Sequence, residues 1–215
     1  MNKKFMTYSL AALTATMLLT GCAKQPQIVG SNGGAKPAMT MGIDRADFQK
    51  AASESIDSML NARVLNKYLA RKEAQNGAGW MPILMISDVK NNTTQRIDVD
   101  MLIKKIRIAL LNDGRFVTTT AARAGGPEDT ATRDVRELAK DDLFNKKTVK
   151  AKDTATSPDF SLGGKIIQRN AKTGSGDQLA EYYFQLTLTE LGTGLALWEG
   201  ESVIGKMGSN DTVSW

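Results

Sequence analysis

The feature that most constrains the fold is a strict alternation of side chains near the C-terminus. In residues 182–189 the even-numbered side chains are large and mostly apolar, and the odd-numbered ones are mostly polar. Tyr182, Phe184, Leu186 and Leu188 alternate with Tyr183, Gln185, Thr187 and Thr189. Successive side chains of a strand point to opposite faces, so this pattern predicts a strand with one buried face. Residues 195–204 follow after Gly192-Thr193-Gly194, which predicts a hairpin.

Three more strands are expected upstream of this hairpin. Residues 80–87 form a short apolar run that feeds a polar loop, residues 116–119 form a second run, and residues 160–169 form a run that contains glycines. A flexible connection, residues 170–178, is expected to join the last of these to the hairpin. Its Gly174-Ser175-Gly176 lacks the glycine and lysine that follow in a phosphate-binding loop, so no phosphate site is predicted there.

Residues 44–60 predict an amphipathic helix packed on its own domain. Asp44 is the expected N-cap, and Asp47 lies in the favourable first turn. One helical stripe carries the apolar residues Phe48, Ala52, Ile56, Met59 and Leu60. A membrane-surface helix, the alternative, would need a more basic polar face. Helical character is expected to continue to Leu69 and to end at Gly77 and Gly79.

Two further helices are expected between the first strands and the third. Asp98 or Asp100 caps one whose inward stripe is Val99, Leu102, Ile103, Ile106, Leu110 and Leu111, and Gly114 ends it. Residues 128–144 predict a charged helix with Val135, Leu138 and either Leu143 or Phe144 facing inward. The lysines at 146–152 stand among aspartates, so a solvated loop is favoured over a site for an anionic surface.

The first 22 residues predict a secretory signal. Lys3 and Lys4 form a positive n-region, residues 10–19 are mostly apolar and uncharged, and small residues precede Cys22. A membrane-spanning helix is the alternative, but residues 5–21 contain several threonines and a serine, and spanning takes roughly 20 predominantly apolar residues. The signal is expected to be absent from the mature chain.

Cys22 makes this signal more specific, because it is the only cysteine in the chain. Leu19-Thr20-Gly21-Cys22 resembles the bacterial lipobox, in which the cysteine sulfur is acylated and the chain is cleaved before it. Ala23 follows, and by resemblance to enterobacterial lipoproteins this residue favours delivery to the outer membrane. Residues 23–41 are rich in glycine with two prolines, which predicts a flexible linker.

Composition narrows the function. Loss of Lys3 and Lys4 lowers the net charge from +5 to +3, too little to indicate nucleic acid binding. The chain has no histidine, which removes the usual general base and the most common metal ligand. Carboxylate catalysis, Ser-Lys chemistry and oxygen-ligand metal sites remain open. We therefore expect a protein without enzymatic activity, and the sequence identifies no catalytic residue, metal ligand set or cofactor.

Three stretches together resemble the LpoB family of penicillin-binding-protein activators: residues 83–92 (ILMISDVKNN), 102–116 (LIKKIRIALLNDGRF) and 184–200 (FQLTLTELGTGLALWEG). The resemblance implies an α+β fold, a mainly antiparallel sheet flanked by helices and similar to TolB amino-terminal domains. It divides the chain into a signal peptide (1–21), a lipidated linker (22–42), the domain (43–205) and a tail (206–215). Trp198 is expected to pack between sheet and helices, with an exposed partner anchor as the alternative.

The same resemblance implies the function. Family members are outer-membrane lipoproteins whose periplasmic domain binds a class A penicillin-binding protein, a bifunctional peptidoglycan synthase, and stimulates it. Lys165 and Arg169 are the candidate partner-binding residues. The alternative is an envelope scaffold or secretion lipoprotein similar to the curli exporter CsgG, which would not activate a synthase.

Overall fold

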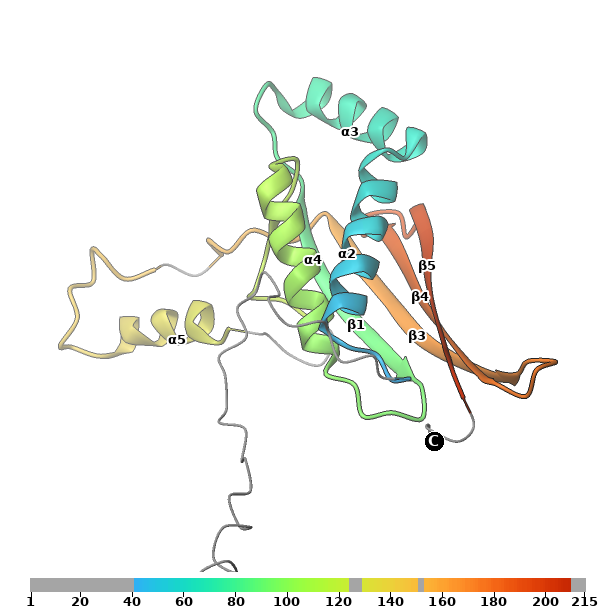
Figure 1. The fold of residues 1–215 in the computed structure, drawn as a ribbon. Coiled ribbons are helices and arrows are strands. Elements are labelled where there is room, and N and C mark those ends of the chain that lie inside the picture. Colours follow the sequence, from blue (N-terminus) through green and yellow to red (C-terminus); the bar gives the residue numbers. More distant parts are fainter. Residues whose placement is uncertain (1–40, 124–128, 151–152, 210–215) are drawn as a thin grey trace, which may run out of the picture. The chain divides into compact units, whose positions relative to one another are not determined.

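The computed structural model describes residues 41–123, 129–150 and 153–209, and these fold into one five-stranded sheet with helices against one face (Figure 1). The predicted signal, Cys22 and nearly all of the predicted linker lie outside the described residues. The elements follow in the order α2 (Arg45–Leu60), α3 (Arg63–Asn76), β1 (Ile83–Asn92), α4 (Val99–Asp113), β2 (Val117–Thr118), α5 (Ala131–Glu137), a 3₁₀ turn η1 (Leu138–Lys140), β3 (Phe160–Lys172), β4 (Gln178–Glu190) and β5 (Ala196–Gly208).

The strands lie in the order β2-β1-β3-β4-β5. The three 13-residue strands β3, β4 and β5 are antiparallel neighbours, whereas β1 is parallel to both β2 and β3. A parallel pair needs a crossover connection, and α4 provides it between β1 and β2. The predicted α+β class with a mainly antiparallel sheet flanked by helices is confirmed, with two parallel pairings that the sequence pattern did not predict.

The start of α2 has the cap that the sequence predicts. Asp44 accepts hydrogen bonds from the backbone N–H groups of Ala46 and Asp47, while the Asp47 carboxylate accepts one from the Asp44 N–H, which completes a capping box. The predicted stripe from Phe48 to Leu60 is buried. The helix therefore packs on its own domain, as expected.

Helical character continues through Leu69 and ends before Gly77, as expected, but in a separate helix, because the chain turns at Asn61 and Ala62 and begins α3. The carbonyl of Leu60 accepts hydrogen bonds from Asn66 Nδ2 at 3.0 Å and from Arg115 Nη1 at 2.8 Å. These bonds satisfy the C-terminal carbonyl of α2, so the chain is free to change direction there.

The core lies between the sheet and helices α2 and α4. Edge-on aromatic pairs join helix to sheet, as in Phe48 with Phe184, whose ring centroids are 6.1 Å apart. The predicted inward residues of β4, Tyr182, Phe184, Leu186 and Leu188, are all buried. Trp198 is 8% exposed and donates a hydrogen bond to Ser58 Oγ at 3.2 Å, so the packing interpretation holds and the exposed-anchor alternative is wrong.

The charged segment after β2 departs from the prediction. Its helix ends at Glu137, the 3₁₀ turn ends at Lys140, and no residue of either is buried. Leu143 is 84% exposed and does not face a core. The polar side chains of this segment form hydrogen bonds within it, for example from Lys146 Nζ to the Ala139 carbonyl. Among the described residues, no other helix or strand packs against the segment.

Three predicted boundaries also change. β1 continues to Asn92 through residues expected to form a loop, and β3 continues to Lys172. The connection to β4 is thereby reduced to a turn in which the Thr173 N–H donates to the Asp177 carbonyl. β5 pairs with β4 as far as Gly208, so residues 206–208 belong to the domain and not to a tail.

Candidate functional site

The sheet has one face covered by helices and one that is not. The helices against the sheet are α2 and α3, which contact β5, and α4, which contacts β1 and β2 (Figure 1). Among the described residues, no helix packs on the opposite side. We call this opposite side the open face. The odd-numbered residues of β3 and β4, and those of β5 from Glu199 onward, point to it.

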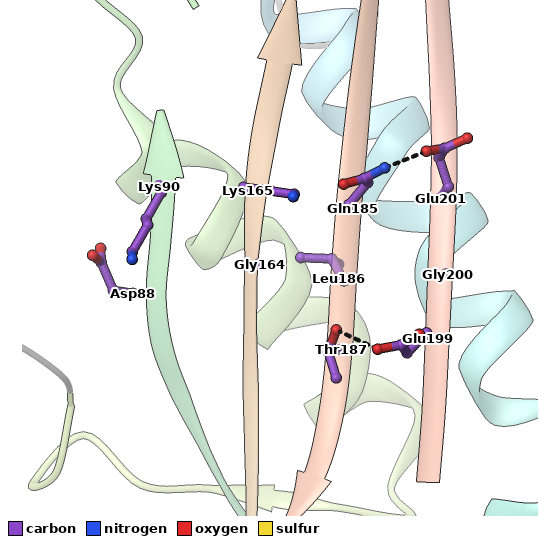
Figure 2. Close-up of a pocket in the computed structure, with 10 residues that line it drawn as sticks. All are labelled: Asp88, Lys90, Gly164, Lys165, Gln185, Leu186, Thr187, Glu199, Gly200 and Glu201. Carbon is purple, nitrogen blue, oxygen red and sulfur yellow. Dashed lines mark hydrogen bonds between the residues drawn. The ribbon is translucent and has the colours of Figure 1, made fainter. Parts of the chain in front are cut away.

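The register of the strands arranges the open face in rows. In one row Lys165, Gln185 and Glu201 are direct neighbours, and in the next row Gly163, Thr187 and Glu199 are. Lys90 of β1 pairs with Lys165. These rows line a shallow groove of about 780 Å³ that also includes Asp88 (Figure 2). The groove is thus built by regular strands and not by loops.

The two sides of the groove carry opposite charge. On the β5 side, Glu201 accepts a hydrogen bond from Gln185 Nε2 at 2.6 Å and Glu199 accepts one from Thr187 Oγ1 at 3.3 Å (Figure 2). On the β1 and β3 side stand Lys90 and Lys165. Lys165 and Glu201 lie two strands apart, about 10 Å by the usual strand spacing. The groove therefore presents a cationic and an anionic edge to one ligand or partner surface.

Two glycines and a bulge shape this groove. Ser87 and Asp88 of β1 lie opposite the single residue Gly163, and this bulge re-aims the end of β1. A Cβ on Gly164 would lie 2.2 Å from the carbonyl oxygen of Gln185. Gly164 is required because β3 and β4 approach closely at that point.

Farther along the same strands the open face becomes apolar. Ile167, Tyr183 and Val203 form one row, and Ala171, Leu179 and Met207 form another. Val203 is 41% exposed and Met207 64% exposed. An apolar area beside a charged groove is the composition expected of a protein interaction surface.

The two candidate partner-binding residues both lie on the open face. Lys165 lines the groove, and Arg169 lies outside it, opposite Glu181 and near Tyr183. The Tyr183 hydroxyl donates to Glu181 at 3.0 Å, and this bond raises the pKa of Tyr183, an effect that the nearby Arg169 opposes. The structure brings Lys165 and Arg169 to one surface, and their role in partner binding stays a prediction.

Several groove residues were missed by sequence reasoning. Lys90 lies in β1, where the sequence pattern predicts a loop. The pattern shows Gln185 and Thr187 only as the polar half of the alternation, and it does not point to Glu199 or Glu201. The alternation of apolar and polar residues could have identified them, because the polar residues of two adjacent strands lie on the same face of the sheet.

The described part of the chain contains no helix long and apolar enough to cross a membrane. Within that same part, no group of three or more acidic, histidine or cysteine side chains is placed to hold a metal ion. The predicted lipidation residue Cys22 lies outside it.

Comparison with known proteins gives the family. The family model of the peptidoglycan-synthase activator LpoB matches residues 47–204. The LpoB C-terminal domain from Salmonella enterica is similar at 12% identity and a TM-score of 0.35, covering 74% of this chain and 98% of that one. The solution structure of Escherichia coli LpoB has 13% identity and a TM-score of 0.36, covering 86% and 80%. Lipoprotein GNA1162 from Neisseria meningitidis has 15% identity and a TM-score of 0.29, covering 63% and 88%.

No curated protein sequence matches this chain. The assignment therefore rests on the family model, whose match takes in every described helix and strand apart from the first residues of α2 and the last of β5. The chain belongs to the LpoB family of peptidoglycan-synthase activators.

Proposed function

We propose that this protein binds a class A penicillin-binding protein and raises its rates of glycan polymerisation and crosslinking. The observation that carries the proposal is the match of the LpoB family model over residues 47–204. The protein itself performs no chemistry in this account. Its contribution is binding energy that favours the active state of the synthase.

The open face is the surface that we assign to the synthase. Its groove offers Lys90 and Lys165 on one side and Glu199 and Glu201 on the other, which fits a partner with the complementary arrangement of charge. The apolar row beside the groove adds area that loses water on binding. Arg169 lies between the groove and the outermost apolar row, where one partner can contact both.

Location completes the proposal. The mature chain is acylated at Cys22 and held at the outer membrane, with the domain in the periplasm. Several acyl chains give an almost permanent anchor, whereas one gives only marginal binding. Replacing Cys22 with serine should move the protein from the membrane fraction to the soluble periplasmic fraction. Retention of the Cys22→Ser protein in the membrane would contradict this anchor.

The experiment for activation uses the mature lipoprotein in detergent with a purified class A synthase and its lipid-linked substrate. We expect the two proteins to co-purify and the polymerisation rate to rise with lipoprotein concentration until binding saturates. The Lys165→Glu/Arg169→Glu variant should require a higher concentration for the same rate. Lys104→Glu is the matched control, because Lys104 is an exposed lysine of α4 on the helical side.

The same experiment separates the alternative function. An envelope scaffold or secretion lipoprotein would leave the synthase rate unchanged at every concentration. That outcome, with a folded lipoprotein and an active synthase, would overturn the proposal. The family match favours activation over this alternative.

A further inference from the structure

The two edges of the sheet differ in length. At one edge β2 has two residues, and at the other β5 has 13. β5 pairs with β4 on one side, and in the described part of the chain no strand pairs with its other side (Figure 1). A long strand edge presents unpaired backbone N–H and C=O groups that can pair with another strand.

The two halves of this edge are protected differently. The half near the β4–β5 turn has a register shift between Leu188 and Thr189 of β4, and it carries the exposed carboxylates Glu199 and Glu201. Bulges and charges are the usual means by which proteins prevent pairing at an edge. The other half, residues 202–208, has no register shift and no carboxylate.

Lys206, the one charged residue in residues 202–208, does not protect the strand edge from pairing. Lys206 turns to the helical side, where its Nζ lies 2.5 Å from Asp47 Oδ2 and donates to the Gly42 carbonyl at 2.7 Å. Its side chain is 15% exposed. On the open face the same half presents Val203 and Met207, and Gly205 between them has no atom within 4 Å of where a Cβ would stand.

We propose that residues 202–208 of β5 pair antiparallel with the same residues of a second copy, about a two-fold axis at Gly205. In this register Val203 lies opposite Met207 of the second copy, and the reverse pair forms across the axis. Within each copy Val203 neighbours Tyr183 and Met207 neighbours Leu179. The apolar rows of the two copies therefore join into continuous rows of six residues, which buries side chains left exposed in the single chain.

Charge favours this register over one whose axis lies nearer the carboxylates of β5. An axis at Gly205 places Glu201 opposite Ser209 of the second copy. An axis at Val203 would instead place Glu199 opposite Met207 and Glu201 opposite Gly205. Opposing an apolar side chain with a carboxylate disfavours that pairing.

The geometry suits two copies on one membrane. A two-fold axis normal to the sheet keeps the helical sides of both copies on the same side. The described chain begins at Met41, whose carbonyl accepts from Tyr182, and Lys206 holds the next residue, Gly42, on that helical side. In both copies, residues 41 and 42 thus lie near the axis and on one side of the joined sheet. The groove with Lys165 and Glu201 stays uncovered, because it lies on the other half of the strands.

Pairing of one short edge buries less surface than the roughly 1,600 Å² of a standard interface, so we expect the contact to form chiefly between anchored copies at high local concentration. The test is disulfide formation by the full-length lipoprotein in native membranes. In Gly205→Cys the two thiols face each other, with Cα atoms about 4.5–5.5 Å apart, which is within disulfide reach. We expect this variant to form a covalent dimer under mild oxidation.

Glu199→Cys is the matched control on the same strand and face. About the proposed axis it lies 12 residues from its own copy, roughly 40 Å along the strands, so it should stay monomeric. Coexpressed Val203→Cys and Met207→Cys chains should crosslink to each other, which provides a second test if Gly205→Cys folds poorly. Adding Val203→Lys to Gly205→Cys should abolish the dimer. Equal crosslinking at residues 199 and 205, or none at 205 with the Val203→Cys and Met207→Cys chains also monomeric, would overturn the proposal.

Discussion

The covered and open faces of the sheet consist of alternating residues of the same three strands, yet they differ in almost every property. On β4, Tyr182 and Leu188 are fully buried against the helices, whereas Gln185 and Thr187, between them in sequence, bond carboxylates on the open face. On β4 the even-numbered side chains form the core, and the odd-numbered side chains remain available to bind a partner. Substitutions on the covered face should therefore change stability, and those on the open face should change binding.

The largest effect is expected for Trp198→Ala on the covered face. The indole is 8% exposed and donates a hydrogen bond to Ser58, so its removal leaves a cavity and breaks that bond. Aromatic truncations in cores cost about 3–5 kcal/mol, and we expect a loss in this range by denaturant unfolding. If the variant kept its melting temperature and lost only synthase binding, Trp198 would belong to the interface and the separation of the two faces would fail.

A smaller loss is expected for Lys206→Met at the covered side of β5. The Lys206 ammonium contacts Asp47 at 2.5 Å and Asp44 at 3.2 Å, and hydrogen bonds of this charged kind contribute about 1.5–3 kcal/mol. Circular dichroism of the variant and wild type across denaturant at neutral pH measures the difference. An unchanged midpoint would show that the contacts add nothing to stability.

The pH dependence of Lys206→Met follows from the same contacts. Burial raises the pKa of Asp44, but hydrogen bonds from the Asp47 N–H and from Lys206 outweigh it, so the pKa lies below the usual value. A depressed folded pKa gives stability that is fully present above the unfolded value of about 3.9 and is lost as pH falls through the folded value. The wild type should therefore lose more stability than the variant between pH 5 and the acid limit. Parallel curves would contradict this linkage.

Gly200→Ala tests how tightly the covered face is packed. A Cβ at residue 200 would lie 2.1 Å from Cζ2 of Trp198, so the indole must shift, and overpacking of this kind costs about 1–3 kcal/mol. In the Trp198→Ala background the same substitution should cost little, because the clashing ring is absent. A double-mutant cycle measures this coupling. Additive losses would mean that Trp198 and Gly200 do not share the space.

The smallest effect on stability is expected for Lys165→Glu/Arg169→Glu on the open face. Surface substitutions away from structural features usually change stability by less than about 0.5 kcal/mol. We expect the melting temperature to stay near that of the wild type while the affinity for the synthase falls. A large loss of stability would show that the open face is part of the scaffold.

The sequence predicted the covered face well because its signals are local. The alternation at 182–189, the Asp44 cap and Gly114, which ends α4 with φ of 82°, each act within a few residues. The parallel pairing of β1 with β3 joins residues more than 70 positions apart, so no local sequence pattern predicts it. The inward-facing helix at 128–144 was wrong because periodicity cannot show whether a partner surface exists.

The groove was harder to predict for the same reason. Lys165 and Arg169 were identified as candidates, but Lys90, Glu199 and Glu201 join them only through the register of four strands. A one-residue shift of any strand would have moved its charges to the helical side. Recognition residues on a sheet are thus set by pairing, and pairing is a tertiary property.

The most direct test of the central claim is site-specific photocrosslinking in intact cells. A photoreactive amino acid at Lys165 or Glu201 reports contacts of the open face, and one at Lys104 or Lys67 reports contacts of the helical side. We predict adducts with a class A penicillin-binding protein at residues 165 and 201 and none at 104 and 67. Synthase adducts confined to residues 104 and 67, or adducts at 165 and 201 only with proteins other than a peptidoglycan synthase, would contradict the account.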